Sequence, residues 1–279
     1  MPRADAAPEA FPLRERVAVV TGAAGLLGRR HLVALHRAGA HVVAVDLDEA
    51  SASAALAPLA CGPGAGEALA IHADVTRPED LRALRDRVLG RFDRVDVLVN
   101  SAALDDRFLP AGPGEDPSRF EELPLEAFRR ALDVNVTGTV LPSQVLGTVM
   151  AERGGGSIVN IASTYGLVAP DQGLYRRPDG TQAFHKGAAY PVAKGAVLSF
   201  TRFLAAYWGG RGVRTNAISP GGVENGQEAW FVRAYGARTP LGRMARPDEL
   251  EGALVFLASD ASSYVTGANL VVDGGWTAW

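Results

Sequence analysis

A regular alternation of short apolar runs with helix-like segments constrains the fold of this chain more than any other feature. The runs are apolar on both faces, which is typical of buried parallel strands, and the segments between them carry apolar residues at helical spacing. This alternation predicts parallel strands joined by crossover helices that cover both faces of one sheet. We therefore expect an α/β fold with a doubly wound sheet. The apolar runs occupy residues 16–22, 41–46, 68–75, 94–103, 156–163, 213–222 and 269–275.

The chain is predicted to form a single domain, because no Pro/Ser-rich linker or change in composition divides its 279 residues. Residues 1–14 are rich in proline and alanine and are expected to form a flexible tail, with the domain spanning residues 15–279. Two long irregular stretches, residues 103–124 and 164–188, follow the carboxyl ends of strands, where ligands bind in open α/β sheets. We therefore expect both stretches to have a function.

The bulk composition argues against several classes of protein. A formal net charge of −3 without a basic run argues against a nucleic-acid partner. Cys61 is the single cysteine, so neither a disulfide framework nor a cysteine metal cluster is expected, and we predict no metal site. The N-terminal residues lack a secretory signal, and no run approaches about 18 apolar residues, so we expect a cytoplasmic protein without a membrane partner.

The turn after the first predicted strand has the pattern of a nucleotide site. Gly22, Gly25 and Gly28 permit a tight turn and a close approach of the backbone to a pyrophosphate, which the start of the next helix stabilises. Asp46 ends the second strand 18 residues beyond Gly28. A carboxylate there binds both ribose hydroxyls of an adenosine and repels a 2′-phosphate by on the order of a few kcal/mol. The sequence thus favours NAD over NADP as the cofactor.

Other polar residues near this turn are candidates for structural or nucleotide-binding roles. Asp74 follows the third strand and is either a turn residue or a contact to adenine. Asn100 ends the fourth strand, where its amide can tie neighbouring strand ends together beside the ribose. Arg29 and Arg30 follow the glycine turn and are either solvated helix residues, which we favour, or phosphate ligands.

Tyr190 and Lys194 lie four residues apart in a predicted helix, which places their Cβ atoms roughly 5–6 Å apart on one face. A phenol has a pKa of about 10 and is a poor base at neutral pH. An ammonium one helical turn away, at an effective dielectric near 20, stabilises the phenolate by about 3 kcal/mol and lowers its pKa by roughly two units. The pair is a candidate acid/base, although any helix can carry these residue types at this spacing.

Eight short motifs cover the chain between about residues 14 and 276. They read "TGAAGLLG", "ADVT", "VNSAA", "DVNVTG", "NIAS", "YPVAK", "ISPGG" and "SSYVTGANLVVDGGW". With them the chain resembles the short-chain dehydrogenase/reductase (SDR) family, in its classical branch, and several segments resemble a subgroup tied to bacterial sugar-modifying pathways. The resemblance implies a Rossmann-like fold of about seven parallel strands and hydride transfer between a nicotinamide and a carbinol or ketone.

The resemblance also implies roles for single residues. Tyr190 would be the acid/base, and Lys194 would lower its pKa and bind the nicotinamide ribose. Ser163 would orient the substrate oxygen, and Asn135 would hold a water relay behind the lysine. The implied cofactor contacts are Gly22, Gly25, Leu26, Leu27, Gly28, Asp46, Leu47, Asp74, Val75, Asn100, Ala102, Tyr190, Lys194, Pro220, Gly221 and Val223.

Two departures from the family pattern affect the expected site. The family's second glycine falls at Leu26 here, and glycines three apart are commoner in its sugar-nucleotide-modifying branch. Ser163 and Tyr190 are 27 residues apart, about twice the usual separation. Residues 164–189 therefore form an insertion, which must bulge over the mouth of the site because Ser163 and Tyr190 have to reach the same oxygen.

The insertion and a later segment are expected to contact the substrate. The insertion is short of apolar anchors and rich in hydrogen-bond donors, so it is either a solvated loop or the wall of a pocket for a polar, hydroxylated or anionic substrate. Residues 221–246 resemble the family's substrate lid, with Trp230, Phe231 and Tyr235 on one helix face as packing or as a cover. The predicted substrate contacts are Thr164, Tyr165, Tyr175, Arg176, His185 and Glu224, with Asp105, Asp106 and Arg107 also within reach.

We therefore expect an NAD(H)-dependent oxidoreductase that interconverts a secondary alcohol and a ketone on a small polar, sugar-like or polyhydroxylated substrate. The alternatives are a sugar-nucleotide epimerase or dehydratase that retains NAD, and a non-catalytic dinucleotide-binding regulator. Only six residues follow Asp273, too few for a sugar-nucleotide domain, and the complete set of implied catalytic residues argues against a regulator. The family also implies a homo-oligomer, a tetramer or dimer, in which Trp276 and Trp279 tuck into a neighbouring subunit.

Overall fold

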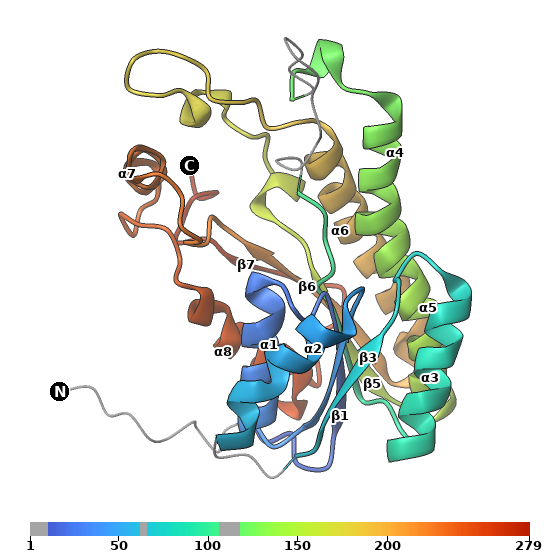
Figure 1. Cartoon of the computed structure of the whole chain (residues 1–279). Coiled ribbons are helices and arrows are strands. Elements are labelled where there is room, and N and C mark those ends of the chain that lie inside the picture. The colour runs from blue at the N-terminus through green and yellow to red at the C-terminus, as the bar shows by residue number, and fades with distance from the viewer. Residues whose placement is uncertain (1–10, 62–65, 106–117) are drawn as a thin grey trace, which may run out of the picture.

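Seven parallel strands form one sheet in the computed structural model, which describes residues 11–61, 66–105 and 118–279 (Figure 1). The strand order is β3-β2-β1-β4-β5-β6-β7, so the chain starts at an inner strand and winds to one edge and then to the other. The predicted doubly wound, Rossmann-like α/β fold is confirmed. The strands are β1 (Val17–Thr21), β2 (His41–Asp46), β3 (Ala68–His72), β4 (Val97–Asn100), β5 (Gly156–Ile161), β6 (Val213–Pro220) and β7 (Asn269–Val272).

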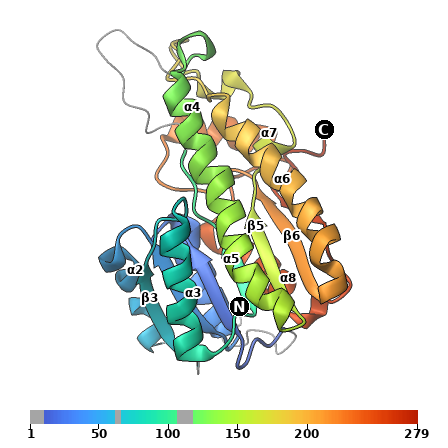
Figure 2. The same cartoon turned by 90° about the vertical axis from the view of Figure 1, so that its right-hand side faces the viewer.

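Helices cover both faces of the sheet, as the alternation predicts (Figures 1 and 2). One apolar core cluster joins the sheet to α1, α2 and α8, and a second joins its other face to α3, α5 and α6. These helices are α1 (Leu26–Arg37), α2 (Glu49–Leu56), α8 (Glu251–Ala258), α3 (Pro78–Phe92), α5 (Gly138–Glu152) and α6 (Ala189–Trp208).

Strand β1 illustrates why a continuous apolar run is required here. Successive side chains of a strand point to opposite faces of the sheet. Val17 and Val19 belong to the cluster with α3, α5 and α6, whereas Ala18 and Val20 belong to the cluster with α1, α2 and α8. All four side chains are at most 1 % exposed, so both faces of the strand need apolar residues.

The segment predicted as one helix over residues 124–152 contains a π-helical turn. Helix α4 (Leu125–Leu132) leads into the π turn Asp133–Thr137, and α5 continues in nearly the same direction (Figure 2). A π turn widens the helix locally and is frequent at functional sites. Asn135 lies in this turn and is completely buried.

The insertion, residues 164–189, has an apolar anchor of its own. It contains two short 3₁₀ helices, Thr164–Gly166 and Gln172–Tyr175. Leu174 and Tyr175 are only 2 % and 5 % exposed and form a separate apolar cluster with Tyr235, Met244 and Trp276. The expectation that the insertion is short of apolar anchors is therefore wrong, because two of its residues complete a cluster supplied by distant parts of the chain.

The insertion is attached to α7 (Ala229–Arg238), which lies beside it above the carboxyl ends of the strands (Figure 1). An ion pair joins Asp171 of the insertion to Arg238 of α7. The ring of Trp276 also stacks on Tyr235 of α7, with centroids 4.3 Å apart. We expected Trp276 to tuck into a neighbouring subunit, but it is buried within its own chain, whereas Trp279 is 82 % exposed.

The folded core includes a residue before the predicted boundary at residue 15. Leu13 is 2 % exposed, and its backbone amide donates a hydrogen bond to the carbonyl of Ala38 at 2.7 Å. The predicted tail, residues 1–14, therefore includes a residue of the core, and residues 1–10 lie outside the part of the chain described. No helix in the described ranges is long and apolar enough to cross a membrane.

Candidate active site

The glycine turn after β1 packs directly against the residues that follow β4. Gly22 has a φ of +64°, and a Cβ on it would lie 2.6 Å from the Cα of Ala102. Thr21 ties the two segments together, because its hydroxyl oxygen accepts hydrogen bonds from the amides of Ser101 and Ala102 at 3.1 and 3.3 Å. Gly28 is equally constrained, since a Cβ there would lie 2.1 Å from the carbonyl oxygen of Gly22.

The start of α1 forms one side of this turn. The helix begins at Leu26, Gly25 is its N-cap, and no side chain caps its first amides in the described structure. Its first turn also contains no acidic residue, so the positive end of the helix dipole is not offset locally. Leu26 is 37 % exposed, whereas Leu27 packs against the core. A side chain at the position of the family's second glycine is therefore tolerated because it points outward.

Asp46 supports the glycine turn from the end of β2. One carboxylate oxygen accepts a hydrogen bond from the amide of Ala24 at 2.9 Å, and the other accepts one from Leu47, also at 2.9 Å. A carboxylate has about four acceptor positions, so these bonds leave capacity for ribose hydroxyls. Asp74 accepts hydrogen bonds from the amide and hydroxyl of Thr76 at 2.9 and 2.7 Å, which supports its interpretation as a turn residue.

A chain of buried polar side chains runs below the site. The amide of Asn100 donates hydrogen bonds to Ser143 at 2.9 Å and to Asn160 at 2.8 Å. Asn160 in turn donates to the hydroxyl of Thr201 at 2.9 Å. Asn100 therefore ties the ends of β4 and β5 together, as predicted, and the chain extends to α5 and α6.

Tyr190 and Lys194 lie in the first turns of α6, four residues apart as the sequence predicts. Lys194 is 3 % exposed, and its Nζ donates a hydrogen bond to the carbonyl of Ile161 at 2.7 Å. Its Nζ lies 5.6 Å from the centroid of the Tyr190 ring. Burial lowers the pKa of Lys194 to about 8, with a smaller opposing effect from the carboxylate of Asp105. The lysine is thus a buried cation close to the tyrosine.

Ser163 and Asn135 are held by backbone contacts. The hydroxyl oxygen of Ser163 accepts a hydrogen bond from the amide of Tyr165 at 3.1 Å, which leaves its proton to be donated elsewhere. The side chain of Asn135 accepts from the amide of Leu104 and donates to its carbonyl, both at 3.0 Å. Asn135 therefore fixes the chain after β4 at the rim of the site.

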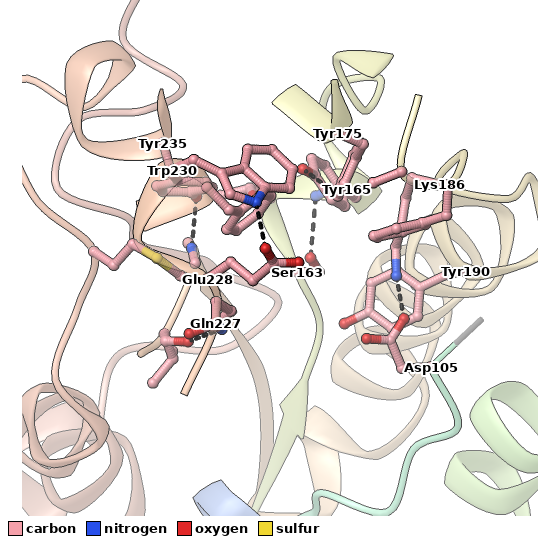
Figure 3. Close-up of a pocket in the computed structure, with 18 of the residues that line it drawn as sticks. Asp105, Ser163, Tyr165, Tyr175, Lys186, Tyr190, Gln227, Glu228, Trp230 and Tyr235 are labelled. Carbon is pink, nitrogen blue, oxygen red and sulfur yellow. Dashed lines mark hydrogen bonds and ion pairs between the residues drawn. The ribbon is translucent and has the colours of Figure 1, made fainter. Parts of the chain in front are cut away.

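Tyr190 and Ser163 line one cavity of about 450 Å³ at the carboxyl end of the sheet (Figure 3). The insertion and α7 form its outer walls. The lining residues are Asp105, Ser163, Thr164, Tyr165, Tyr175, Arg177, Ala183, Phe184, Lys186, Tyr190, Gly221, Gly222, Val223, Gly226, Gln227, Glu228, Trp230, Phe231, Tyr235 and Met244.

Three of the six predicted substrate contacts line this cavity: Thr164, Tyr165 and Tyr175. The structure does not bring the other three to it. Arg176 and Glu224 are exposed, and Arg177 occupies the lining position that Arg176 was expected to take. The amide of His185 binds the hydroxyl of Ser118 at 2.8 Å, and its side chain lines a different hollow. Asp106 and Arg107 lie outside the described residues.

Aromatic side chains form the wall opposite Tyr190 (Figure 3). The hydroxyls of Tyr165 and Tyr175 lie 3.0 Å apart, and the ring of Tyr175 is 5.5 Å from that of Phe231. Burial raises the pKa of Tyr165, so its hydroxyl stays protonated at neutral pH. The indole of Trp230 donates a hydrogen bond to Glu228 at 2.8 Å. The aromatic face of α7 therefore covers the cavity as well as packing against the insertion.

Asp105 was expected to lie within reach of the substrate, but its pairing with Lys186 was not predicted. These two side chains form an ion pair, and Lys186 Nζ lies 4.2 Å from the centroid of the Tyr190 ring. The pair joins residues 81 positions apart, so no local pattern reveals it. One compositional signal was available: the sequence contains 28 lysine and arginine residues, and only Lys186 and Lys194 are lysines.

Comparison with known proteins identifies the family. Residues 16–175 match the family model described as short chain dehydrogenase, and residues 178–277 match the model described as Enoyl-(Acyl carrier protein) reductase. The chain therefore belongs to the short-chain dehydrogenase/reductase family, whose members are oxidoreductases that use a nicotinamide dinucleotide.

Three relatives illustrate the range of this similarity. The D-threitol dehydrogenase of Mycolicibacterium smegmatis is 41 % identical over 272 residues, which cover 96 % of this chain and 95 % of the relative. The NAD-dependent glycerol dehydrogenase of Listeria innocua is 32 % identical over 272 residues, covering 96 % of each chain. The crystal structure of a gluconate 5-dehydrogenase from Burkholderia cenocepacia in complex with NADP and tartrate is 30 % identical, with a TM-score of 0.82, and covers 97 % of this chain and 98 % of that one.

The residues around the glycine turn fit such a dinucleotide. The turn has no room for a Cβ at Gly22 or Gly28, so the backbone itself forms the surface, and the first amides of α1 are open to an anion in the described structure. Asp46 is in reach of the same turn, and Gly221 and Val223 line the cavity that contains Tyr190.

Proposed function

We propose that this protein is an NAD(H)-dependent dehydrogenase that interconverts a secondary alcohol and a ketone on a small polyhydroxylated molecule. The observation that carries the proposal is that Tyr190 and Ser163 line one cavity while the buried ammonium of Lys194 lies beside the Tyr190 ring. In this proposal the phenol of Tyr190 acts as the acid/base and the hydroxyl of Ser163 as the hydrogen-bond donor at one oxygen position of the substrate. The substrate class is supported by relatives whose names specify threitol and glycerol as substrates.

In the proposed reaction, Tyr190 accepts the proton of the substrate hydroxyl during oxidation and returns it during reduction. Lys194 favours the phenolate form of Tyr190, because a cation in a buried site is weakly screened. Ser163 donates its hydroxyl proton to the reacting oxygen, where negative charge develops. The bound nicotinamide supplies the hydride acceptor or donor. The face of α7 that carries Trp230 and Phe231 excludes water from this position.

We infer that the residues of the glycine turn, Gly22 to Gly28, hold the pyrophosphate, and that Asp46 binds the adenosine ribose. Pro220, Gly221 and Val223 would face the nicotinamide. The preference for NAD is supported by the negative charge of Asp46, which repels a 2′-phosphate. Among the relatives, the glycerol dehydrogenase is named as NAD-dependent, whereas the gluconate dehydrogenase structure contains NADP.

A homo-oligomer in the cytoplasm remains our prediction. The oligomeric state is supported by an exposed aromatic row on α6. Phe203 is 58 % and Tyr207 is 63 % exposed, and their ring centroids lie 5.6 Å apart. Burial of such a row between copies of the chain would remove apolar surface from water. Light scattering of the purified protein measures the number of subunits directly.

Cofactor titration followed by turnover assays tests the proposal. NADH and NADPH are titrated separately while nicotinamide fluorescence is recorded, and alcohols from glycerol to hexitols are then assayed with the preferred cofactor. Tyr190→Phe is expected to lower kcat/KM at least 100-fold and to leave NADH affinity within about threefold, because a general acid/base contributes about 10²–10⁴. Tyr264→Phe, at a fully exposed tyrosine outside this row, is the matched control. Undiminished turnover by Tyr190→Phe contradicts the mechanism, and binding of neither cofactor contradicts the function.

A further inference from the structure

Lys186 is a second cation at the proposed acid/base. The sequence contains 28 lysine and arginine residues but only two lysines, and both ammonium groups lie over the ring of Tyr190. Lys186 is the nearer of the two, at 4.2 Å from the ring centroid against 5.6 Å for Lys194. A chain that uses arginine nearly everywhere else thus carries its compact ammonium groups at this one site.

Lys186 faces the substrate cavity and is paired there with Asp105 (Figure 3). The side chain of Lys186 is only 6 % exposed, and that of Asp105 is 30 % exposed. Both residues line the same cavity as Tyr190 and Ser163. The pair is therefore positioned to contact the part of a substrate that lies next to the reacting carbon.

The chemistry of the pair selects for one kind of group. An ammonium can only donate hydrogen bonds, and a carboxylate can only accept them. A hydroxyl does both, so a single hydroxyl can accept from Lys186 and donate to Asp105. A carbonyl or ether oxygen can use only the first partner, and a methyl group can use neither. An arginine at position 186 would engage both carboxylate oxygens in a planar fork, which leaves Asp105 fewer acceptor positions for a hydroxyl and holds the remaining guanidinium donors in fixed directions.

The charges around the cavity favour a neutral ligand. Among the described lining residues, Asp105 and Glu228 are acidic and Arg177 and Lys186 are basic, so the two signs balance. A carboxylate close to Lys186 would also be close to Asp105, which repels it. The opposite wall is aromatic and offers apolar surface to the carbon side of a substrate.

We propose that Lys186 and Asp105 together bind the hydroxyl on the carbon next to the reacting carbon, which makes the enzyme selective for neutral vicinal diols. The inference rests on the proposed function, because it takes the reacting oxygen to lie at Tyr190. Lys186 and Asp105 are specificity residues in this proposal, and Tyr190 remains the acid/base.

Two alcohols with the same carbon skeleton separate this role from a general effect on Tyr190. Butane-2,3-diol carries the second hydroxyl and butan-2-ol lacks it, while both react at a secondary carbinol. The ratio of their kcat/KM values is measured for the wild type, Lys186→Met, Lys186→Arg, Asp105→Leu and the double variant Lys186→Met/Asp105→Leu. Arg202→Met, on the exposed side of α6, is the matched control. NADH affinity, measured by fluorescence, verifies that each variant folds.

The wild type is expected to prefer the diol by about 100-fold or more, because a site built for a hydroxyl is left with unpaired polar groups when the hydroxyl is missing. Lys186→Met and Asp105→Leu should each lower this ratio about tenfold or more, since each removes a charged hydrogen-bond partner. The double variant should lose no more than the worse single variant, because the two residues act on one hydroxyl. Lys186→Arg keeps the charge and should still lose most of the preference, which gives a second test if the methionine variant does not fold.

Each other outcome identifies which idea fails. Equal losses of kcat/KM for both alcohols in the variants, with an unchanged ratio, would overturn the diol role and assign the pair an effect on Tyr190. A wild type that oxidises both alcohols equally well would overturn the diol role and leave the proposed function intact. A wild type that binds NADH but oxidises neither these alcohols nor any polyol would overturn the proposed function, and this inference with it.

Discussion

The buried ammonium of Lys194 should make the protein less stable below pH 8 than above it. Burial lowers the pKa of Lys194 from 10.5 to about 8 in the folded protein. The unfolded chain therefore binds a proton at this lysine between about pH 8 and 10.5, where the folded chain does not. Because stability rises with pH wherever the unfolded state binds more protons, the unfolding free energy should increase across this window.

The pKa difference sets the size of the effect. At about 1.4 kcal/mol per pKa unit, a shift from 10.5 to about 8 corresponds to about 3 kcal/mol of unfolding free energy. Lys194→Met removes the buried charge but also the hydrogen bond to Ile161, which is worth about 1 kcal/mol. The variant should therefore be about 2 kcal/mol more stable than the wild type at pH 7 and should lose this advantage by pH 10.5.

Urea unfolding followed by circular dichroism, at one protein concentration and without cofactor, measures this difference. The quantity to plot is the unfolding free energy of the wild type minus that of Lys194→Met at half-unit steps from pH 7 to 10.5. Arg202→Met, an exposed cation on the same helix, should give a flat difference. The reasoning is refuted if the wild-type minus Lys194→Met difference in unfolding free energy stays constant or falls as the pH rises. Such a result would mean that Lys194 binds its proton as tightly in the folded protein as in the unfolded chain.

Two further predictions concern the cofactor site. Gly28→Ala places a Cβ 2.1 Å from the Gly22 carbonyl oxygen, so α1 must shift and NADH affinity should fall at least tenfold in a fluorescence titration. Gly90→Ala, where a Cβ meets nothing within 4 Å, should bind NADH like the wild type, and equal affinities for both variants would contradict the close packing of the turn. Asp46→Asn keeps an oxygen for the amide of Ala24 but removes the charge, so the ratio of NADPH to NADH affinity should rise about tenfold or more. An unchanged ratio would show that another residue sets the cofactor preference.

The sequence predicted those parts of the molecule that follow from local patterns. The seven strands could be identified because each is an apolar run of a few residues between helices, and strands such as β1 are buried on both faces. The tight turn at Gly22 and Gly28 could be predicted because its geometry excludes a Cβ at both positions. The spacing of Tyr190 and Lys194 is likewise a local property of one helix.

The parts that were not predicted depend on contacts between distant segments. Tyr175 of the insertion is buried because α7 and the C-terminal segment supply the rest of its apolar cluster, which composition of the insertion cannot reveal. Arg177 faces the cavity and Arg176 does not, and neighbouring residues of the same type cannot be told apart without the backbone. The ion pair between Asp105 and Lys186 joins two loops that leave different strands.

The attachment of the insertion to α7 has a consequence for how substrate range can change in this protein. Asp171 is bound to Arg238, and Tyr175 shares a cluster with Tyr235 and Trp276, so three separate segments form one unit. Exchange of the insertion alone with that of a relative would leave the partners of these residues without contacts. A new substrate specificity is therefore acquired most readily when the insertion, α7 and the C-terminal segment are exchanged together. The glycine turn and the sheet can stay unchanged.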